Sequence, residues 1–218
     1  MKMLSHAEAR AVYDRFGARQ DRQSFYEDEA LADLLAHLAL NEAQAVFEFG
    51  CGTGRLAKTL LDDYLPTTAR YLGIDSSTTM VRLAEERIAP FGARAKILHT
   101  DGTMQFAVAA NSFDRFVSTY VLDLLSEEDI AALLAEAQHI LRPGGLLGVA
   151  GLTHGNTLVS RLVEKIWVGV HTLRPTLVGG CRPISLLKYL GGSAWQIRHQ
   201  RHITSVGISS EVVIAERL

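Results

Sequence analysis

Cysteine is scarce in this sequence, and long apolar runs are absent from it. Its two cysteines, Cys51 and Cys181, stand far apart and outside any CxxC spacing, which excludes a disulfide framework and a zinc knuckle. No uncharged apolar run approaches the roughly 18 residues that a membrane span needs. The first residues also lack the apolar core of a signal peptide. We therefore expect a cytoplasmic protein with no stable membrane insertion and no metal site.

An excess of positive charge is also missing. The 218 residues carry 22 Lys and Arg against 24 Asp and Glu, a formal charge of -2, and the sequence pI is about 6.4. A protein that binds nucleic acid electrostatically normally shows a basic stripe and a pI above roughly 9. The composition therefore argues against a nucleic-acid partner. With 48% hydrophobic residues, the chain has enough apolar surface for the core of one domain.

What the sequence does contain is an alternation of strand and helix signals. The segment from Ala7 to about Leu40 is predicted to be helical, because Leu31, Leu34, Leu35 and Leu38 recur at three- and four-residue spacing, with the acids of residues 27–29 and Asp33 towards the other face. Short apolar runs then predict strands at residues 45–49, 71–75, 95–99, 113–119 and 146–152, and helices lie between several of them, at 78–88 and from Ser126 to Leu141. Strands that alternate with helices imply right-handed crossovers and a mostly parallel sheet.

The last third of the chain has a different pattern. A helical stretch covers residues 158–173, a short helix begins near Pro183 or Ile184, and two β-prone runs follow at 195–203 and 206–215. The link between these two runs is too short for a parallel crossover, so they form an antiparallel hairpin. The predicted fold is α/β, a Rossmann-like doubly wound sheet of five parallel strands plus this hairpin, with helices on both faces.

A glycine cluster follows the first strand directly. Residues 48–54 read Glu-Phe-Gly-Cys-Gly-Thr-Gly, at the strand end where an open parallel sheet binds its ligand. Glycines allow the backbone to approach a ligand closely, and the next helix offers free N–H groups. A structural turn is one alternative. Another is a dinucleotide site, because Gly52, Gly54 and Ala57 satisfy GxGxxA, with Asp75 near the position of its ribose-binding acid.

The acid at Glu48, the glycines at Gly50, Gly52 and Gly54, and the C-terminal hairpin together resemble the class I S-adenosylmethionine-dependent methyltransferases. The family's first motif is an acid, any residue, then GxGxG, and the resemblance places Cys51 in the same cofactor loop. It implies that S-adenosylmethionine is the cofactor. Glu48 then points either at the methionyl ammonium of the cofactor or at the amides of the glycine loop.

Two later acids extend the resemblance. Asp75, followed by Ser76, matches the acid that holds the ribose hydroxyls, and Asp101, with the neighbouring amides of Gly102 and Thr103, matches the segment near the adenine amino group. Each acid also has a purely structural alternative. Asp75 is placed to cap the next helix, and Asp101 precedes Gly102 in a favoured turn pair.

No catalytic dyad stands out. Tyr120 and Asp123 follow the fourth strand and His154 follows the fifth, so all three are candidates at the ligand-binding edge. Methyl transfer is an in-line displacement for which positioning supplies most of the catalysis, and a general base is needed only where the acceptor must lose a proton.

We therefore expect one methyltransferase domain over residues 1–218, with a helical lid at 1–42, a cofactor-binding core at 43–152, and substrate-side helices and the hairpin at 153–218. The acceptor is expected to be a small molecule. A non-catalytic S-adenosylmethionine-binding protein and a nicotinamide-dependent oxidoreductase are the two alternatives. The sequence leaves the acceptor and the oligomeric state open.

Overall fold

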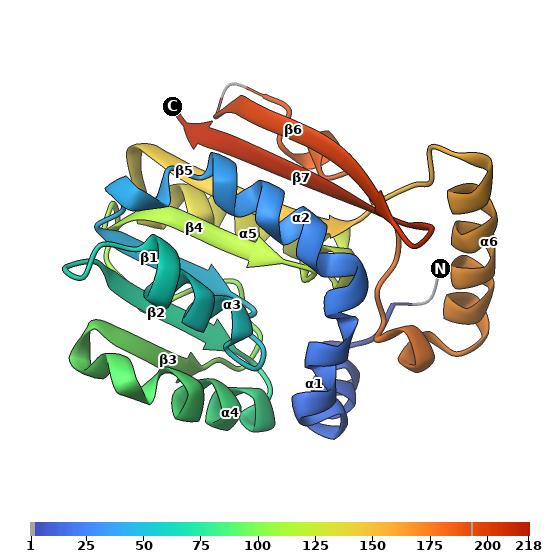
Figure 1. Ribbon diagram of the computed structural model, residues 1–218, viewed down its shortest axis with the longest axis horizontal. Coiled ribbons are helices and arrows are strands. Elements are labelled where there is room, and N and C mark those ends of the chain that lie inside the picture. Colours follow the sequence, from blue (N-terminus) through green and yellow to red (C-terminus); the bar gives the residue numbers. More distant parts are fainter. Residues whose placement is uncertain (1–2, 193) are drawn as a thin grey trace.

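Seven strands form one sheet at the centre of the molecule (Figure 1). The structure, a computed structural model, describes residues 3–192 and 194–218. The strands are β1 (Ala45–Phe49), β2 (Arg70–Asp75), β3 (Ala95–His99), β4 (Phe113–Thr119), β5 (Leu141–Leu152), β6 (Trp195–Ser205) and β7 (Ile208–Arg217). They are ordered β3-β2-β1-β4-β5-β7-β6. The first five strands run parallel, and β7 pairs antiparallel with both β5 and β6.

Helices cover both faces of this sheet. They are α1 (His6–Phe16), α2 (Ser24–His37), α3 (Arg55–Thr59), α4 (Thr78–Ile88), α5 (Glu127–Ile140) and α6 (Leu158–Leu173), with shorter helical turns η1 (Gly17–Gln23), η2 (Leu40–Glu42), η3 (Leu60–Tyr64), η4 (Ala89–Arg94), η5 (Leu122–Leu124), η6 (Pro175–Val178) and η7 (Leu187–Tyr189). The apolar cores of α2, α3 and α4 pack on one face of the sheet, and α5 packs on the other. Helices α1 and α6 stand at the end toward which the parallel strands point (Figure 1).

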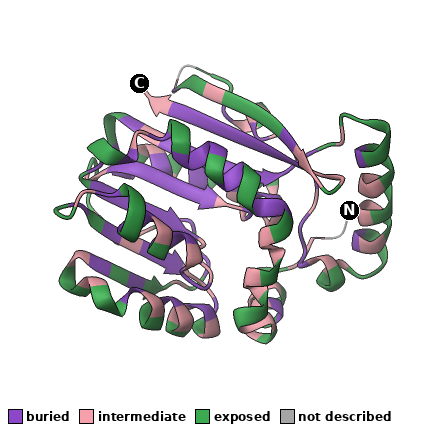
Figure 2. Cartoon of the chain, in the orientation of Figure 1, coloured by how far each residue is buried: buried purple, intermediate pink, exposed green. Residues whose placement is uncertain are grey.

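The alternation of side chains along the strands divides the core into two layers. Val46 lies in the layer shared with α2 and α3, while its neighbour Phe47 lies in the layer shared with α5 and stacks on Phe116. The central strands are buried along their length, whereas the edge strand β6 is largely exposed (Figure 2). Burial on both faces explains why β1 is a continuous apolar run apart from Glu48.

The predicted fold class is confirmed, including the C-terminal hairpin. Strands β6 and β7 are joined at Val206 and Gly207, whose φ angles are +52° and +82°. Two consecutive residues with positive φ make a turn whose twist matches that of an antiparallel pair. A glycine at the second position takes this conformation without steric cost.

The segment from Ala7 to about Leu40 is helical, as predicted, but it is divided into α1, η1 and α2. Gly17, with a φ of +48°, ends α1, and the polar segment η1 separates it from α2. The acids on α2 also differ from expectation, because Glu27 and Asp33 are buried and only the neighbouring Asp28 and Glu29 are exposed. Asp33 accepts hydrogen bonds from Arg201 and lies 2.7 Å from His199, both on β6. A polar network therefore ties α2 to the sheet beside its leucines.

Two other boundaries also differ from the sequence prediction. The segment after Pro183 contains only the short turn η7 instead of a helix starting there. Strand β5 begins at Leu141, five residues earlier than predicted, because Leu141 pairs with Phe113 before a shift in register. Within the described residues, no helix combines the length and the apolar character that crossing a membrane requires.

Candidate functional site

One cavity lies at the carboxyl ends of β1, β2 and β4, where a parallel sheet binds its ligand. Its floor is the glycine loop after β1. Gly50 has a φ of +76°, and a Cβ atom there would lie 2.4 Å from Val121 Cγ2, so the loop passes too close to the segment after β4 for a side chain. A Cβ atom on Gly52 would meet nothing within 4 Å. The loop therefore leaves space above Gly52 in which a ligand can approach the backbone.

Asp75, at the end of β2, is hydrogen-bonded to the same loop. Its Oδ2 accepts from the Gly52 amide at 2.9 Å, and its Oδ1 accepts from the Ser77 amide at 2.8 Å. Burial raises the pKa of Asp75, while these amides act against that rise. Each carboxylate oxygen keeps acceptor capacity beyond its one amide. Asp75 can thus orient the loop and still receive two hydroxyl groups of a ligand.

Glu48 is the second carboxylate of the cavity and is almost fully buried. Its Oε2 accepts a hydrogen bond from the Tyr71 hydroxyl at 2.5 Å. Burial raises the pKa of Glu48 to about 7, and the nearby Asp75 charge adds to the rise. The amides of Gly50 and Cys51 both donate to the Ile74 carbonyl. The sequence left open whether Glu48 points at the ammonium group of the cofactor or at the loop amides. These two loop amides are already hydrogen-bonded to another residue.

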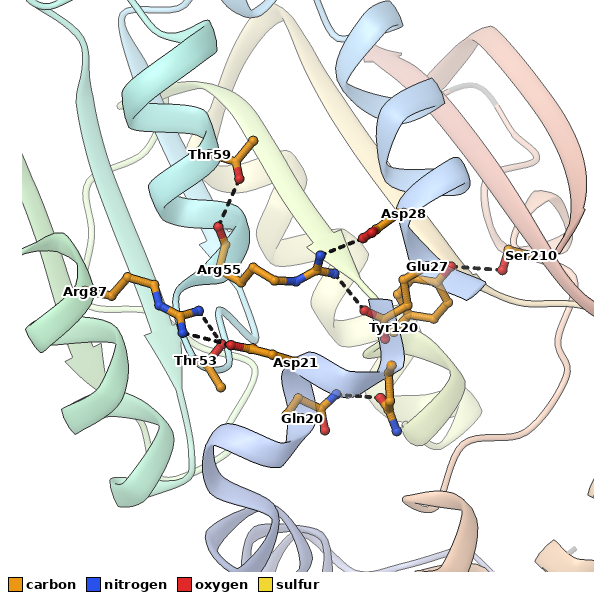
Figure 3. A network of polar contacts seen from close by, with 11 residues as sticks. Gln20, Asp21, Glu27, Asp28, Thr53, Arg55, Thr59, Arg87, Tyr120 and Ser210 are labelled. Atoms are coloured by element: carbon orange, nitrogen blue, oxygen red, sulfur yellow. Dashed lines mark hydrogen bonds and ion pairs between the residues drawn. The ribbon is translucent and has the colours of Figure 1, made fainter. Parts of the chain in front are cut away.

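The N-terminal segment closes the cavity from above. Leu4, His6, Ala9 and Tyr13 belong to the lining, as do Gln20 and Asp21 of η1. Asp21 accepts hydrogen bonds from the Thr53 hydroxyl at 2.5 Å and from Arg87 at 2.8 Å (Figure 3). Helix α1 is attached to the opposite rim, where Arg10 donates to the Asp101 carbonyl and Asp14 accepts from Ser77. Residues 4–21 thus bridge the loops that follow β1, β2 and β3.

A polar arm extends the cavity toward α2. Arg55 donates to Glu27 at 3.0 Å and to Asp28 at 2.6 Å, and Tyr120 lies beside Glu27 (Figure 3). Glu27 and Arg55 line the cavity, whereas Asp28 is exposed outside it. Burial raises the pKa of Glu27 to about 7, although Arg55 acts in the opposite direction. This arm therefore presents a carboxyl group that exchanges its proton near neutral pH.

The structure brings together most of the predicted cofactor residues. The lining includes Glu48, Gly50, Cys51, Gly52, Asp75, Ser76 and Gly102. Gly54 lies below the loop. A Cβ atom at this position would be 2.9 Å from Ala84 Cα, so the lack of a side chain permits close packing of α4. Asp101 and Thr103 are exposed and outside the lining. The Thr103 amide donates to the Asp101 carboxylate, which holds the pKa of that acid below its ordinary value.

The three catalytic candidates lie in different surroundings. Tyr120 lines the cavity, but its hydroxyl lies 2.9 Å from Ser210 Oγ on β7, and burial raises its pKa. Asp123 is fully buried outside the lining, and burial raises its pKa to about 7. Its Oδ1 has no hydrogen-bond partner among the described residues. His154 is exposed and pairs with Glu164 at 2.7 Å.

Sequence reasoning missed the polar arm and the contacts of Asp21 that attach the N-terminal segment to the cavity. Glu27 stands in a run of acids that is typical of a solvated helix face, and its partner Arg55 is 28 residues away in the sequence. Asp21 lies in a segment without apolar periodicity. The one usable signal is positional, because Arg55 directly follows the glycine loop and therefore has to begin its helix at the cavity.

Comparison with known proteins agrees with this geometry. A family described as "Methyltransferase domain" matches residues 46–145, which contain the glycine loop and Asp75. An uncharacterised methyltransferase of Geobacillus kaustophilus is 30% identical over 141 residues, which are 62% of each chain. Trans-aconitate 2-methyltransferase of an Azoarcus species is 32% identical over 120 residues, 55% of this chain and 44% of that protein. The chain thus spans less than two thirds of the length of these curated relatives.

Solved structures share the whole fold at low sequence identity. A protein described as the [4+2]-cyclase SpnF superposes with a TM-score of 0.74 at 16% identity, over 100% of this chain and 98% of that one. An S-adenosylmethionine-dependent methyltransferase from Methanosarcina mazei superposes with a TM-score of 0.67 at 19% identity, over 84% of this chain and 97% of that one. Residues 46–145 thus match a methyltransferase domain, and the matches together support a class I S-adenosylmethionine-dependent methyltransferase.

Proposed function

We propose that the chain transfers a methyl group from S-adenosylmethionine to a small-molecule acceptor. The observation that carries this proposal is the pairing of Glu48 and Asp75 in one cavity, on the two sides of a glycine loop with open space above Gly52. S-adenosylmethionine carries an ammonium group, which needs an anionic partner. At a separate position it carries a ribose diol, which needs a group that accepts two hydrogen bonds. These two carboxyl groups are suited to those needs.

The remaining binding roles follow from position. S-adenosylmethionine supplies an electrophilic methyl group on a sulfonium centre. Glu48 would pair with the ammonium and Asp75 with the ribose hydroxyls, while Ser76 and Gly102 would border the adenine end. Tyr13 and Ala9 of α1 cover the cavity and would exclude water from it. In this proposal residues 4–21 act as the lid, and α2, which packs on the sheet, is a fixed part of the core.

An acceptor with little negative charge is favoured by the lining of the cavity. Among the described residues, four carboxyl groups line it, on Asp21, Glu27, Glu48 and Asp75, against the cationic Arg55 and the imidazole of His6. Such a surface repels polyanions. A relative named as a tRNA N(3)-methylcytidine methyltransferase is 29% identical over 56% of this chain, so RNA is the alternative acceptor that an experiment has to address.

Glu27 is the group that we propose as the proton acceptor. It lines the cavity, Arg55 holds one of its oxygens, and its pKa of about 7 suits proton transfer at neutral pH. The acceptor's lone pair would bond to the methyl carbon, with the sulfide of S-adenosylhomocysteine as the leaving group, and Glu27 would take up the acceptor proton. We also place this chemistry in the cytoplasm, where the free, buried Cys51 and Cys181 would stay reduced.

Calorimetric titration of the protein with S-adenosylmethionine, S-adenosylhomocysteine and NADH tests the proposal. We expect micromolar binding of the two sulfur ligands, mutual competition between them, and no binding of NADH. Release of S-adenosylhomocysteine is then measured with a panel of neutral and cationic small acceptors and with total tRNA. Binding of NADH alone would support the oxidoreductase alternative, whereas turnover with tRNA alone would overturn the small-molecule acceptor.

A further inference from the structure

Helix α6 exposes a row of large apolar side chains to solvent. Leu158 is 86% exposed, Leu162 is 60% exposed and Ile166 is 61% exposed, at a spacing of four residues that places them along one side of the helix. Val159 and Leu173 continue the row. We call these five residues, with Leu177 of η6, the α6 stripe. A continuous exposed apolar patch of this kind usually marks an interaction site.

The opposite side of α6 fixes the helix to the rest of the protein. The Trp167 indole donates to the Cys181 carbonyl at 2.8 Å, and His171 Nε2 lies 3.1 Å from the Gly180 carbonyl oxygen. Ser160 and His171 are fully or almost fully buried on this side. The helix is therefore held in one rotation, and its stripe points away from the molecule instead of into a core.

Charge at the stripe is of one sign. Arg161 and Lys165 are exposed one turn apart along the edge of the stripe, and Arg174 is exposed just after its end. The one acid of α6, Glu164, faces inward and binds His154 and the Gly155 amide. Arg161 lies near enough to Glu164 to help lower the pKa of that acid. Among the described residues, however, none of these three cations forms an ion pair, and all three border the apolar row of a chain whose net charge is -2.

We propose that the α6 stripe docks the protein on an anionic lipid surface. Apolar side chains in a row, bordered by Lys and Arg on the polar side, are the features of helices that lie in a membrane interface. A second copy of this chain would meet the same cations without an exposed acid of α6 to pair with them. A layer of anionic headgroups neutralises them and accepts the whole length of a convex helix. The proposal does not depend on the methyl-transfer activity.

The surroundings of α6 fit a helix that lies flat on the surface. Its 16 residues span about 24 Å, and no described helix is suited to crossing a membrane. Val206, at the tip of the β6–β7 hairpin, is 75% exposed, and the adjoining Gly207 packs against Val163 of α6. The hairpin tip therefore lies next to the docking helix and extends the apolar contact by one side chain.

Sedimentation with lipid vesicles tests the proposal on the ligand-free protein. We expect binding to vesicles of equal parts phosphatidylglycerol and phosphatidylcholine, little binding to phosphatidylcholine alone, and weakening by salt. Each cation near an anionic surface contributes about fivefold to the partition coefficient. Arg161→Glu with Lys165→Glu should therefore lower it at least 25-fold by that estimate. Arg82→Glu with Lys96→Glu, the same change of charge on α4 and β3 at the far edge of the sheet, should leave it unchanged.

A matched pair of apolar variants separates the stripe from general hydrophobicity. Ile166→Asp should abolish vesicle binding, whereas Leu98→Asp, at a 50% exposed leucine on the edge strand β3, should not affect it. Both positions are at the surface, so circular dichroism and the unfolding midpoint should match the wild type. This makes a loss of binding by Ile166→Asp attributable to docking.

Three results would overturn the proposal. The first is absence of sedimentation with anionic vesicles, and the second is equal loss of binding in the α6 variants and their β3 and α4 controls. The third is a dimer in light scattering that Ile166→Asp converts to a monomer, because the stripe would then be an interface between copies of this chain.

Discussion

The buried carboxyl group of Glu48 makes the stability of the ligand-free protein depend on pH. Its pKa is about 7 in the folded protein, against an ordinary value of 4.5. Between these values the folded state binds this proton more tightly than the unfolded chain does, so the free energy of unfolding falls as pH rises through the window. One pKa unit corresponds to about 1.4 kcal/mol. Glu48 alone should therefore lower stability by about 3 kcal/mol between pH 4 and pH 8.

Glu48→Gln removes this proton while keeping an oxygen that can accept from the Tyr71 hydroxyl. Any fixed cost of burying the amide is the same at each pH and cancels in a comparison across pH. Glu27 and Asp123, whose pKa values are also about 7, titrate alike in both proteins. The difference between the two pH profiles therefore isolates Glu48. We expect the variant to lose about 3 kcal/mol less than the wild type from pH 4 to pH 8.

Urea unfolding at one-unit pH intervals measures this difference directly. The same two proteins are then titrated with S-adenosylmethionine between pH 6 and pH 8. In the proposed site the ionised form of Glu48 pairs with the ligand's ammonium group, so wild-type affinity should rise with pH up to about 7 and then level off. The affinity of the variant should show no such rise and be weaker at pH 8 by about 1.5–3 kcal/mol. Equal pH profiles of stability would refute the reasoning, because Glu48 would then not titrate in this window.

Four further predictions follow from the cavity. Asp75→Ala should weaken S-adenosylmethionine binding by about 1.5–3 kcal/mol in calorimetry, and unchanged affinity would show that Asp75 serves only the loop. Gly50→Ala should cost about 1–3 kcal/mol of unfolding free energy, because its Cβ would overlap Val121. Asp21→Ala should cost less than about 1 kcal/mol but speed ligand release in stopped-flow experiments. Glu27→Gln should lower kcat about 10²- to 10⁴-fold and remove the Glu27 ionisation near pH 7 from the pH profile of kcat measured at saturating S-adenosylmethionine.

The sheet was predictable because its signals are local. Strands β1, β3 and β4 and helix α4 coincide with their predicted ranges. Each strand is a short run of apolar residues that ends in polar or glycine residues. Helix α4 begins where Ser77 accepts from the Met80 amide, a cap that the sequence displays directly. The glycine loop was equally visible, since alternate glycines between a strand and a helix are rare outside ligand sites.

The burial of acids on α2 was not predictable, because their partners are far away in the sequence. Asp33 meets Arg201 across 168 residues, and Glu27 meets Arg55 only after the sheet has formed. Helical periodicity places all the acids opposite the leucines, and only tertiary contact separates the buried ones from the exposed ones. The same limit hid the lid contacts, in which Asp14 and Asp21 bind residues of α4 and its cap.

Three polar attachments hold residues 4–21, the proposed lid, over the cavity. Arg10, Asp14 and Asp21 each bind one of the three loops that would contact the cofactor, those after β3, β2 and β1. Hydrogen bonds of this kind contribute about 1 kcal/mol each, so opening residues 4–21 costs only a few kcal/mol in polar contacts. A ligand that orders all three loops would strengthen these contacts together. With residues 4–21 in the proposed role of a lid, cofactor binding and lid closure would be one coupled equilibrium, and loosening any single attachment should raise the rate of ligand exchange more than it lowers the stability of the fold.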